Sequence, residues 1–164
     1  MKDLLLRIWE NRALTLSLKL LSHLTSLLSV AAFGYLCYLT LAVSPAVLIK
    51  VCVTLALPFL AVTLIRRKIN APRPYELYGF TEQAPRSRKG ASFPSRHAHS
   101  AFAIGTLLCL FHPALGAALL ALALGMCAAR VLLGIHFVRD VTAGALTGVI
   151  SSLIGALLFG ILPL

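Results

Sequence analysis

The sequence predicts an all-α, polytopic membrane helical bundle that forms a single domain over residues 1–164. Hydrophobic residues make up 59% of the chain and charged residues only 12%, whereas soluble domains carry about 25% charged residues. The mean hydropathy is +0.91. The apolar residues also gather in runs close to the roughly 20 residues that a helix needs to cross the hydrocarbon of a bilayer. Composition and run length therefore indicate a membrane protein.

Five apolar runs are candidate membrane-spanning helices, and they cover residues 24–43, 45–65, 96–112, 114–133 and 141–162. The connections at Val43-Ser44 and His112-Pro113 are very short. The connection over residues 66–96 is long, polar and basic, and long loops in compact proteins are usually functional. If the runs cross in alternation, the amino terminus, the 66–96 loop and residues 134–140 lie on one side and the carboxyl terminus on the other.

Residues 3–22 have a different pattern, because charged residues interleave with Leu, Ile and Trp. This pattern predicts an amphipathic helix that lies in the membrane interface. A long extension of the first membrane helix is the alternative.

The chain is strongly basic, with 15 Lys and Arg against 5 Asp and Glu and a formal net charge of +10. The apolar runs leave no soluble basic face for nucleic acid, so we expect lipid headgroups and phosphate as the anionic partners. We expect a multi-pass protein of the cell membrane. Positive charge favours a cytoplasmic position for the basic side, but arginines of an active site would add to that charge, so the side stays open, as does the oligomeric state.

Three polar clusters lie at the ends of apolar runs on the basic side. The first is Arg66-Arg67-Lys68 with Arg73, the second is Pro94-Ser95-Arg96-His97, and the third joins Arg130, His136 and Asp140. Because each cluster ends an apolar run, folding can bring all three to the same depth. Guanidinium groups match the geometry of phosphate, and a charge near membrane depth is a functional hypothesis by default.

The spacing of His136 and Asp140 suits nucleophilic chemistry. Residues four apart share a helix face, and a carboxylate bonded to one imidazole nitrogen makes the other nitrogen more basic. An ordinary His–Asp pair at a helix start is the alternative. Ser95 is expected to cap the helix that follows it, and a helix amino terminus attracts anions. His97 beside it is placed to transfer a proton. The sequence has no cluster of Asp and Glu residues of the kind that holds the metal ions of a two-metal phosphatase, so we predict no metal site.

Together the clusters resemble the type 2 phosphatidic acid phosphatase superfamily, which includes lipid phosphate phosphatases and vanadium-dependent haloperoxidases. Its signature is Lys-x6-Arg-Pro, Pro-Ser-Gly-His and Ser-Arg-x5-His-x3-Asp. This chain has Arg66-x6-Arg73-Pro74, Pro94-Ser95-Arg96-His97 and Ala129-Arg130-x5-His136-x3-Asp140. It departs from the signature at Arg66, Arg96 and Ala129, which replace lysine, glycine and serine.

The resemblance implies a lipid phosphatase that works without metal or another cofactor. His136 would attack phosphorus to form a phosphohistidine, Asp140 would orient His136, and His97 would protonate the leaving oxygen and then activate water. The phosphoryl oxygens would be held by Arg73, Arg130, Ser95 and either Arg66 or Lys68, with Arg96 as an added cation. Candidate substrates are phosphatidylglycerophosphate, phosphatidic acid and undecaprenyl diphosphate.

Two other functions fit parts of the pattern. A lipid-binding membrane protein with a degenerate site would have lost His97 or His136, and both are present. A vanadate-dependent peroxidase would share the phosphate cradle, but such proteins are generally soluble.

Overall fold

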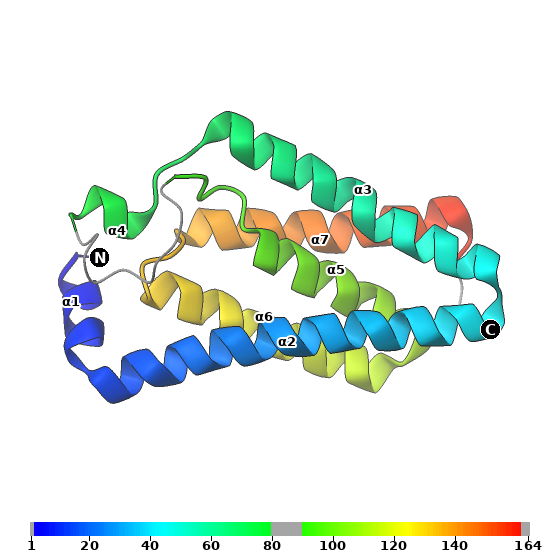
Figure 1. Cartoon of the computed structure of the whole chain (residues 1–164), viewed down its shortest axis with the longest axis horizontal. Helices are drawn as coiled ribbons and strands as arrows, with labels where there is room; N and C mark the ends of the chain where they lie inside the picture. The colour runs from blue at the N-terminus through cyan, green and yellow to red at the C-terminus, as the bar shows by residue number, and fades with distance from the viewer. Residues whose placement is uncertain (1, 80–89, 162–164) are drawn as a thin grey trace.

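The computed structural model describes residues 2–79 and 90–161, in which every regular element is an α-helix (Figure 1). In chain order the helices are α1 (Lys2–Glu10), α2 (Arg12–Val43), α3 (Pro45–Ile69), α4 (Pro74–Leu77), α5 (Arg96–Phe111), α6 (Pro113–Leu132) and α7 (Val138–Phe159). Residues 80–89 of the predicted 66–96 loop, and residue 162 at the end of the predicted last span, lie outside the described residues.

The long helices run side by side between two ends of the molecule, and α2, α3, α6 and α7 are each long and apolar enough to cross a membrane. The amino terminus, α1 and α4 lie at one end and the carboxyl terminus at the other, as Figure 1 shows. This arrangement follows the predicted alternation. The structure is that of a multi-pass membrane protein, a polytopic helical bundle as the sequence predicted.

Helix α5 occupies the predicted span over residues 96–112 and is the shortest of the five long helices. It has 16 residues and is therefore about 24 Å long, less than the roughly 30 Å of a hydrocarbon core. Nearly every side chain from Ala98 to Leu108 is buried, and α5 contacts α2, α3, α6 and α7. A helix that is apolar all round is a buried helix. The segment is thus the central core helix, which the four longer helices surround.

Helices α5 and α7 pack closely through glycines. Gly144 and Gly148 lie four residues apart on α7, and a Cβ at these positions would collide with the backbone oxygens of Ser95 and His99, respectively. Small residues let helix backbones approach in this way. The backbone N–H of Ser95 also donates to the backbone oxygen of Asp140 at 2.9 Å. This contact fixes the start of α5 against the start of α7.

The predicted helix over residues 3–22 is divided in the structure. Helix α1 ends at Glu10, and the side chain of Asn11 caps α2 by accepting from the backbone N–H of Leu14 at 3.0 Å. Residues 12–22 therefore continue into α2 as an extension of the first span, because a cap at Asn11 starts a new helix. In α1, Leu5 and Ile8 are buried while most other side chains are exposed, so this short helix is amphipathic.

Candidate active site

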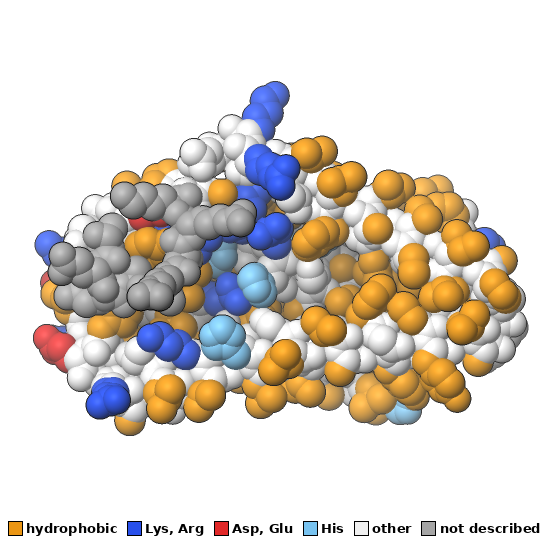
Figure 2. Space-filling view, viewed as in Figure 1, with side chains coloured by type: hydrophobic (Ala, Val, Ile, Leu, Met, Phe, Trp, Pro, Cys, Tyr) orange, Lys and Arg blue, Asp and Glu red, His pale blue; other side chains and the backbone are white. Residues whose placement is uncertain are grey.

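A polar cavity of about 490 Å³ is lined by the first half of α2, the end of α3, the start of α5 and the end of α6. Figure 2 shows Lys, Arg and His side chains gathered around it, beside a surface of apolar side chains. Among the described residues, no Asp or Glu lines the cavity, and its basic and imidazole groups are Lys19, His23, Arg66, Arg67, Arg73, Arg96, His97, Arg130 and His136. Residues from all three predicted clusters thus line one cavity.

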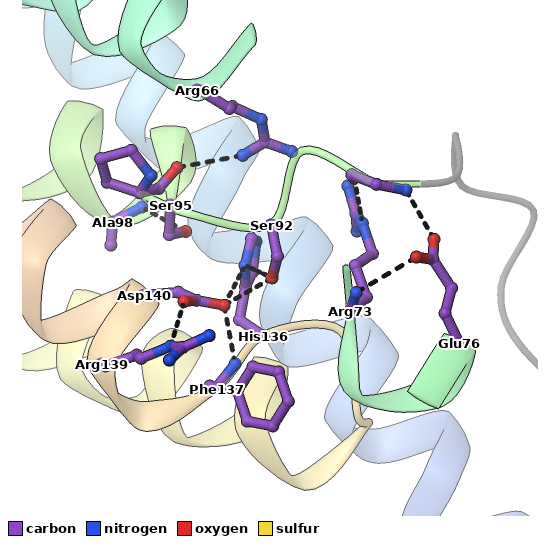
Figure 3. A network of polar contacts seen from close by, with 12 residues as sticks. Arg66, Arg73, Glu76, Ser92, Ser95, Ala98, His136, Phe137, Arg139 and Asp140 are labelled. Atoms are coloured by element: carbon purple, nitrogen blue, oxygen red, sulfur yellow. Dashed lines mark hydrogen bonds and ion pairs between the residues drawn. The ribbon is translucent and has the colours of Figure 1, made fainter. Parts of the chain in front are cut away.

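His136, which lines this cavity, lies next to Asp140, and Ser92 contacts both side chains (Figure 3). His136 Nδ1 is 3.6 Å from Asp140 Oδ2 and 3.3 Å from Ser92 Oγ. Asp140 Oδ2 accepts from the Ser92 hydroxyl and, at 2.9 Å, from the backbone N–H of Phe137. When Nδ1 carries the proton and faces these acceptors, Nε2 keeps its lone pair and can act as a nucleophile.

The environment of His136 keeps its imidazole neutral. Burial lowers the pKa of His136 to about 4; the contact with Asp140 opposes this change, and the charges of Arg130, Arg73 and Arg66 reinforce it. A neutral imidazole is the form that attacks an electrophile. The side chain is only 1% exposed, yet it lines the polar cavity.

Arg73 is held by a short network at the start of α4. Its Nε donates to the backbone oxygen of Gly90 at 3.2 Å. Glu76 accepts from the backbone N–H of Arg73 at 3.2 Å and from that of Gly90 at 2.7 Å. Glu76 therefore ties the start of α4 to the segment that precedes α5 and fixes Arg73 at the cavity wall (Figure 3).

Two further guanidinium groups are buried at the cavity. Arg66 donates from Nη1 to the backbone oxygen of Pro94 at 3.2 Å. Arg130 Nε is buried without a hydrogen-bond partner among the described residues. Buried charges are costly unless they are paired, so these groups suit an anion in the cavity. Lys68 is exposed and does not line the cavity; of the two alternatives, Arg66 is the residue that the structure brings to it.

The first turn of α5 supplies Arg96 and His97. His97 is exposed and lines the polar cavity, as does the half-buried Arg96. Ser95 is fully buried and caps α5 by accepting from the backbone N–H of Ala98, which confirms the predicted cap, but it is not part of the cavity wall. His99 points elsewhere, with its Nδ1 at 3.2 Å from Thr147 Oγ1.

Several residues at the cavity were not found from the sequence. The sequence patterns assigned no site role to Lys19 or His23, whereas both lie within α2 and line the cavity. Their spacing of four residues was the available signal. Ser92 and Glu76 carried no signal of their own, because each acts through contacts with distant parts of the chain.

An apolar groove continues from the polar cavity between α2 and α3. It consists of two smaller cavities of about 440 and 320 Å³. Arg96 and His97 line both the polar cavity and the first of these, whereas Phe33 and Phe59 line both smaller cavities. Polar and apolar binding space are thus joined at the start of α5.

Comparisons with known proteins agree with this arrangement. Residues 47–160 match the model of the PAP2 superfamily. The chain is 47% identical over 62 residues to the bacitracin transport permease protein BcrC of Bacillus licheniformis and 35% identical over 104 residues to the lipid A 1-phosphatase of Rhizobium johnstonii. These matches cover 38% and 61% of this chain but only 30% and 43% of the relatives. The chain therefore spans less than half the length of these curated relatives.

Two solved structures share the fold. The crystal structure of Aquifex aeolicus LpxE aligns with a TM-score of 0.69 at 27% identity and covers 93% of this chain and 92% of that one. A PAP2-type phosphatidylglycerolphosphate phosphatase from Bacillus subtilis aligns with a TM-score of 0.67 at 19% identity and covers 96% of this chain and 83% of that one; this second likeness concerns the fold alone.

Proposed function

The chain belongs to the PAP2 superfamily, and we propose that it hydrolyses a phosphate monoester or diphosphate of a membrane lipid through a phosphohistidine on His136, without a metal. One observation carries the proposal: a neutral imidazole, backed by Asp140, lies in a cavity with three buried guanidiniums and no lining carboxylate among the described residues.

The proposed reaction has two displacements. In the first, His136 Nε2 attacks phosphorus, the P–N bond forms and the P–O bond to the lipid breaks. The leaving oxygen takes a proton from His97. In the second, His97 removes a proton from water, whose oxygen attacks phosphorus and breaks the P–N bond. Inorganic phosphate leaves and His136 is restored. Each histidine has then returned to its starting protonation state, as general acid–base catalysis requires.

The guanidiniums supply the electrostatic part of this mechanism. Arg66, Arg73 and Arg130 would hold the phosphoryl oxygens on which charge gathers in the transition state, a contribution that is usually the largest in such reactions. Arg66 and Arg73 are themselves anchored to backbone oxygens, so they need little reorganisation. Ser95 would act indirectly, by capping the helix whose first turn carries Arg96 and His97.

The lipid nature of the substrate is supported by the apolar groove. It begins at Arg96 and His97 and continues along Phe33, Phe59 and Ile104, so a phosphate in the polar cavity would leave its tail along α5. Phosphatidylglycerophosphate, phosphatidic acid and undecaprenyl diphosphate all have this form. The enzyme would act at the cell membrane; the surplus of basic residues favours a cytoplasmic site, whereas bacterial members of the family commonly face outward.

The test is phosphate release by purified protein in detergent, with a chelator present, from each of these three lipids. Release by the wild type and not by His136→Ala is expected, with both proteins showing the same melting temperature. Release that His136→Ala retains would exclude the proposed nucleophile. Binding of the lipids without any release would favour the alternative, a lipid-binding protein with a degenerate site, and strong inhibition by the chelator would contradict the metal-free mechanism.

A further inference from the structure

Helix α2 contributes a wall of the polar cavity that lies outside the region matched by the family model. That region begins at residue 47, whereas Lys19, Ser22 and His23 of α2 line the cavity together with His97 and His136. Residues at these spacings share one face of a helix, about one turn apart. The cavity therefore has a second set of polar groups besides those of the family signature.

The cavity carries more positive charge than one phosphate group requires. Three buried guanidiniums, those of Arg66, Arg73 and Arg130, already line the cavity together with His136. Lys19 and Arg96 add two further cations, and no salt bridge joins either of them to a carboxylate in the described part of the chain. Like charges gathered in one cavity repel one another, so this surplus suits a ligand with a second anionic group.

The face of α2 grades from polar to apolar along its length. Lys19, Ser22 and His23 line the polar cavity. The next turns supply Ser26 and Ser29, and after them Val30 and Phe33, to the apolar groove. One helix face thus presents first a cation and an imidazole, then hydroxyl groups and finally an aromatic ring. This order matches an amphiphile whose anionic end has more than one group before its tail begins.

We infer that Lys19 and His23 of α2, with Arg96 of α5, form a second anion-binding subsite, and that the substrate class is a lipid diphosphate. The inference rests on the proposed function. The terminal phosphoryl group lies against Arg66, Arg73 and Arg130, and the phosphate next to the lipid lies at the second subsite. Arg96 lines both the polar cavity and the groove. A residue that contacts the phosphate next to the lipid tail must lie where these two spaces meet.

The chemistry at this subsite concerns the leaving group. His136 attacks the terminal phosphorus, the P–N bond forms and the bond from that phosphorus to the bridging oxygen breaks. The bridging oxygen stays on the lipid monophosphate, with its new charge neutralised by a proton from His97. Lys19, His23 and Arg96 hold the anionic oxygens that this phosphate keeps throughout the step, whereas the alcohol that leaves a monoester has no phosphate oxygens for them to hold.

The test compares two substrates with the same polyprenyl tail, a diphosphate and a monophosphate. The variant is Lys19→Gln/His23→Gln, and the control is Arg12→Gln, which removes an exposed cation from the same helix outside the cavity. We expect the double variant to lose about tenfold or more in kcat/KM for the diphosphate, since charge-assisted hydrogen bonds are among the strongest in proteins, and less than threefold for the monophosphate. Equal losses on both substrates, or none, would overturn the inference.

A binding measurement separates this inference from the proposed function. Inorganic diphosphate should raise the melting temperature of the wild-type protein in detergent more than inorganic phosphate does at equal concentration. This difference should disappear in Lys19→Gln/His23→Gln and persist in Arg12→Gln. If the wild type hydrolyses no lipid but shows this difference, the proposed function fails and the second subsite stands. If diphosphate stabilises no better than phosphate, the subsite is refuted whatever the activity.

Discussion

Replacing Ser92 with alanine removes the hydroxyl group that contacts both His136 and Asp140. The side chain is fully buried, donates to Asp140 Oδ2 and lies 3.3 Å from His136 Nδ1. A hydrogen bond to a charged group contributes about 1.5–3 kcal/mol, and about 1.4 kcal/mol corresponds to a factor of ten in rate. If this contribution orients the nucleophile, Ser92→Ala should lower kcat by roughly tenfold to a hundredfold.

Kinetics of phosphate release in detergent measure this effect, and separate values of kcat and KM distinguish positioning of the nucleophile from substrate binding. Because Ser92 does not line the cavity, KM should change little. Ser151→Ala is the matched control, since it removes a hydroxyl that bonds within its own helix, to the Gly148 backbone oxygen. If Ser92 acts through Asp140, the variant that combines Ser92→Ala with Asp140→Asn should be no slower than Asp140→Asn alone, because residues that act as a unit are not additive. An unchanged kcat, or a raised KM with kcat intact, would refute this reasoning.

Three further predictions follow from the same geometry. Burial lowers the pKa of His136 to about 4, so the neutral imidazole predominates above that pH. An NMR titration of the labelled imidazoles, with the His136 signal assigned from the His136→Gln variant, should give a midpoint near 4 for this residue. A midpoint near the ordinary value of about 6.5 would contradict the burial argument. Arg66→Gln should lower kcat/KM by about a hundredfold, the order found when a transition-state donor is removed, while Lys68→Gln keeps wild-type kinetics; the reverse result would mean that Lys68 fills this role. Gly148→Leu should force α7 away from the backbone of His99 and lower the melting temperature by several degrees, since overpacking costs about 1–3 kcal/mol, whereas an unchanged melting temperature would show that the two helices can separate freely.

The parts of the fold that the sequence predicted well depend on local patterns. Apolar run length located the four long helices, and a serine before a helical run located the cap at Ser95. His136 and Asp140 are only four residues apart, so their contact could also be predicted from the sequence. Their catalytic roles stay predictions.

The parts that were not predicted depend on contacts between distant segments. Run length located α5 but could not show that the other four long helices bury it, because composition alone does not reveal which helices pack around which. Ser92 meets Asp140 only because the segment before α5 packs on the start of α7. Lys19 and His23 face the cavity only because α2 continues as one helix from Arg12 and packs on α5 and α6. The sequence signature covers none of Ser92, Lys19 and His23.

The central claim, a covalent intermediate on His136, is tested most directly by trapping it. His97→Ala removes the residue that would activate water, while an activated aryl phosphate, whose leaving group needs no proton, still permits the first displacement. With the substrate labelled on phosphorus and the reaction quenched in alkali, where phosphohistidine is stable, mass spectrometry of the peptides should locate the phosphoryl group on His136. The same treatment of the variant that combines His97→Ala with His136→Ala should give no label. A label on another residue, or none while the aryl alcohol is still released in a burst, would contradict the account.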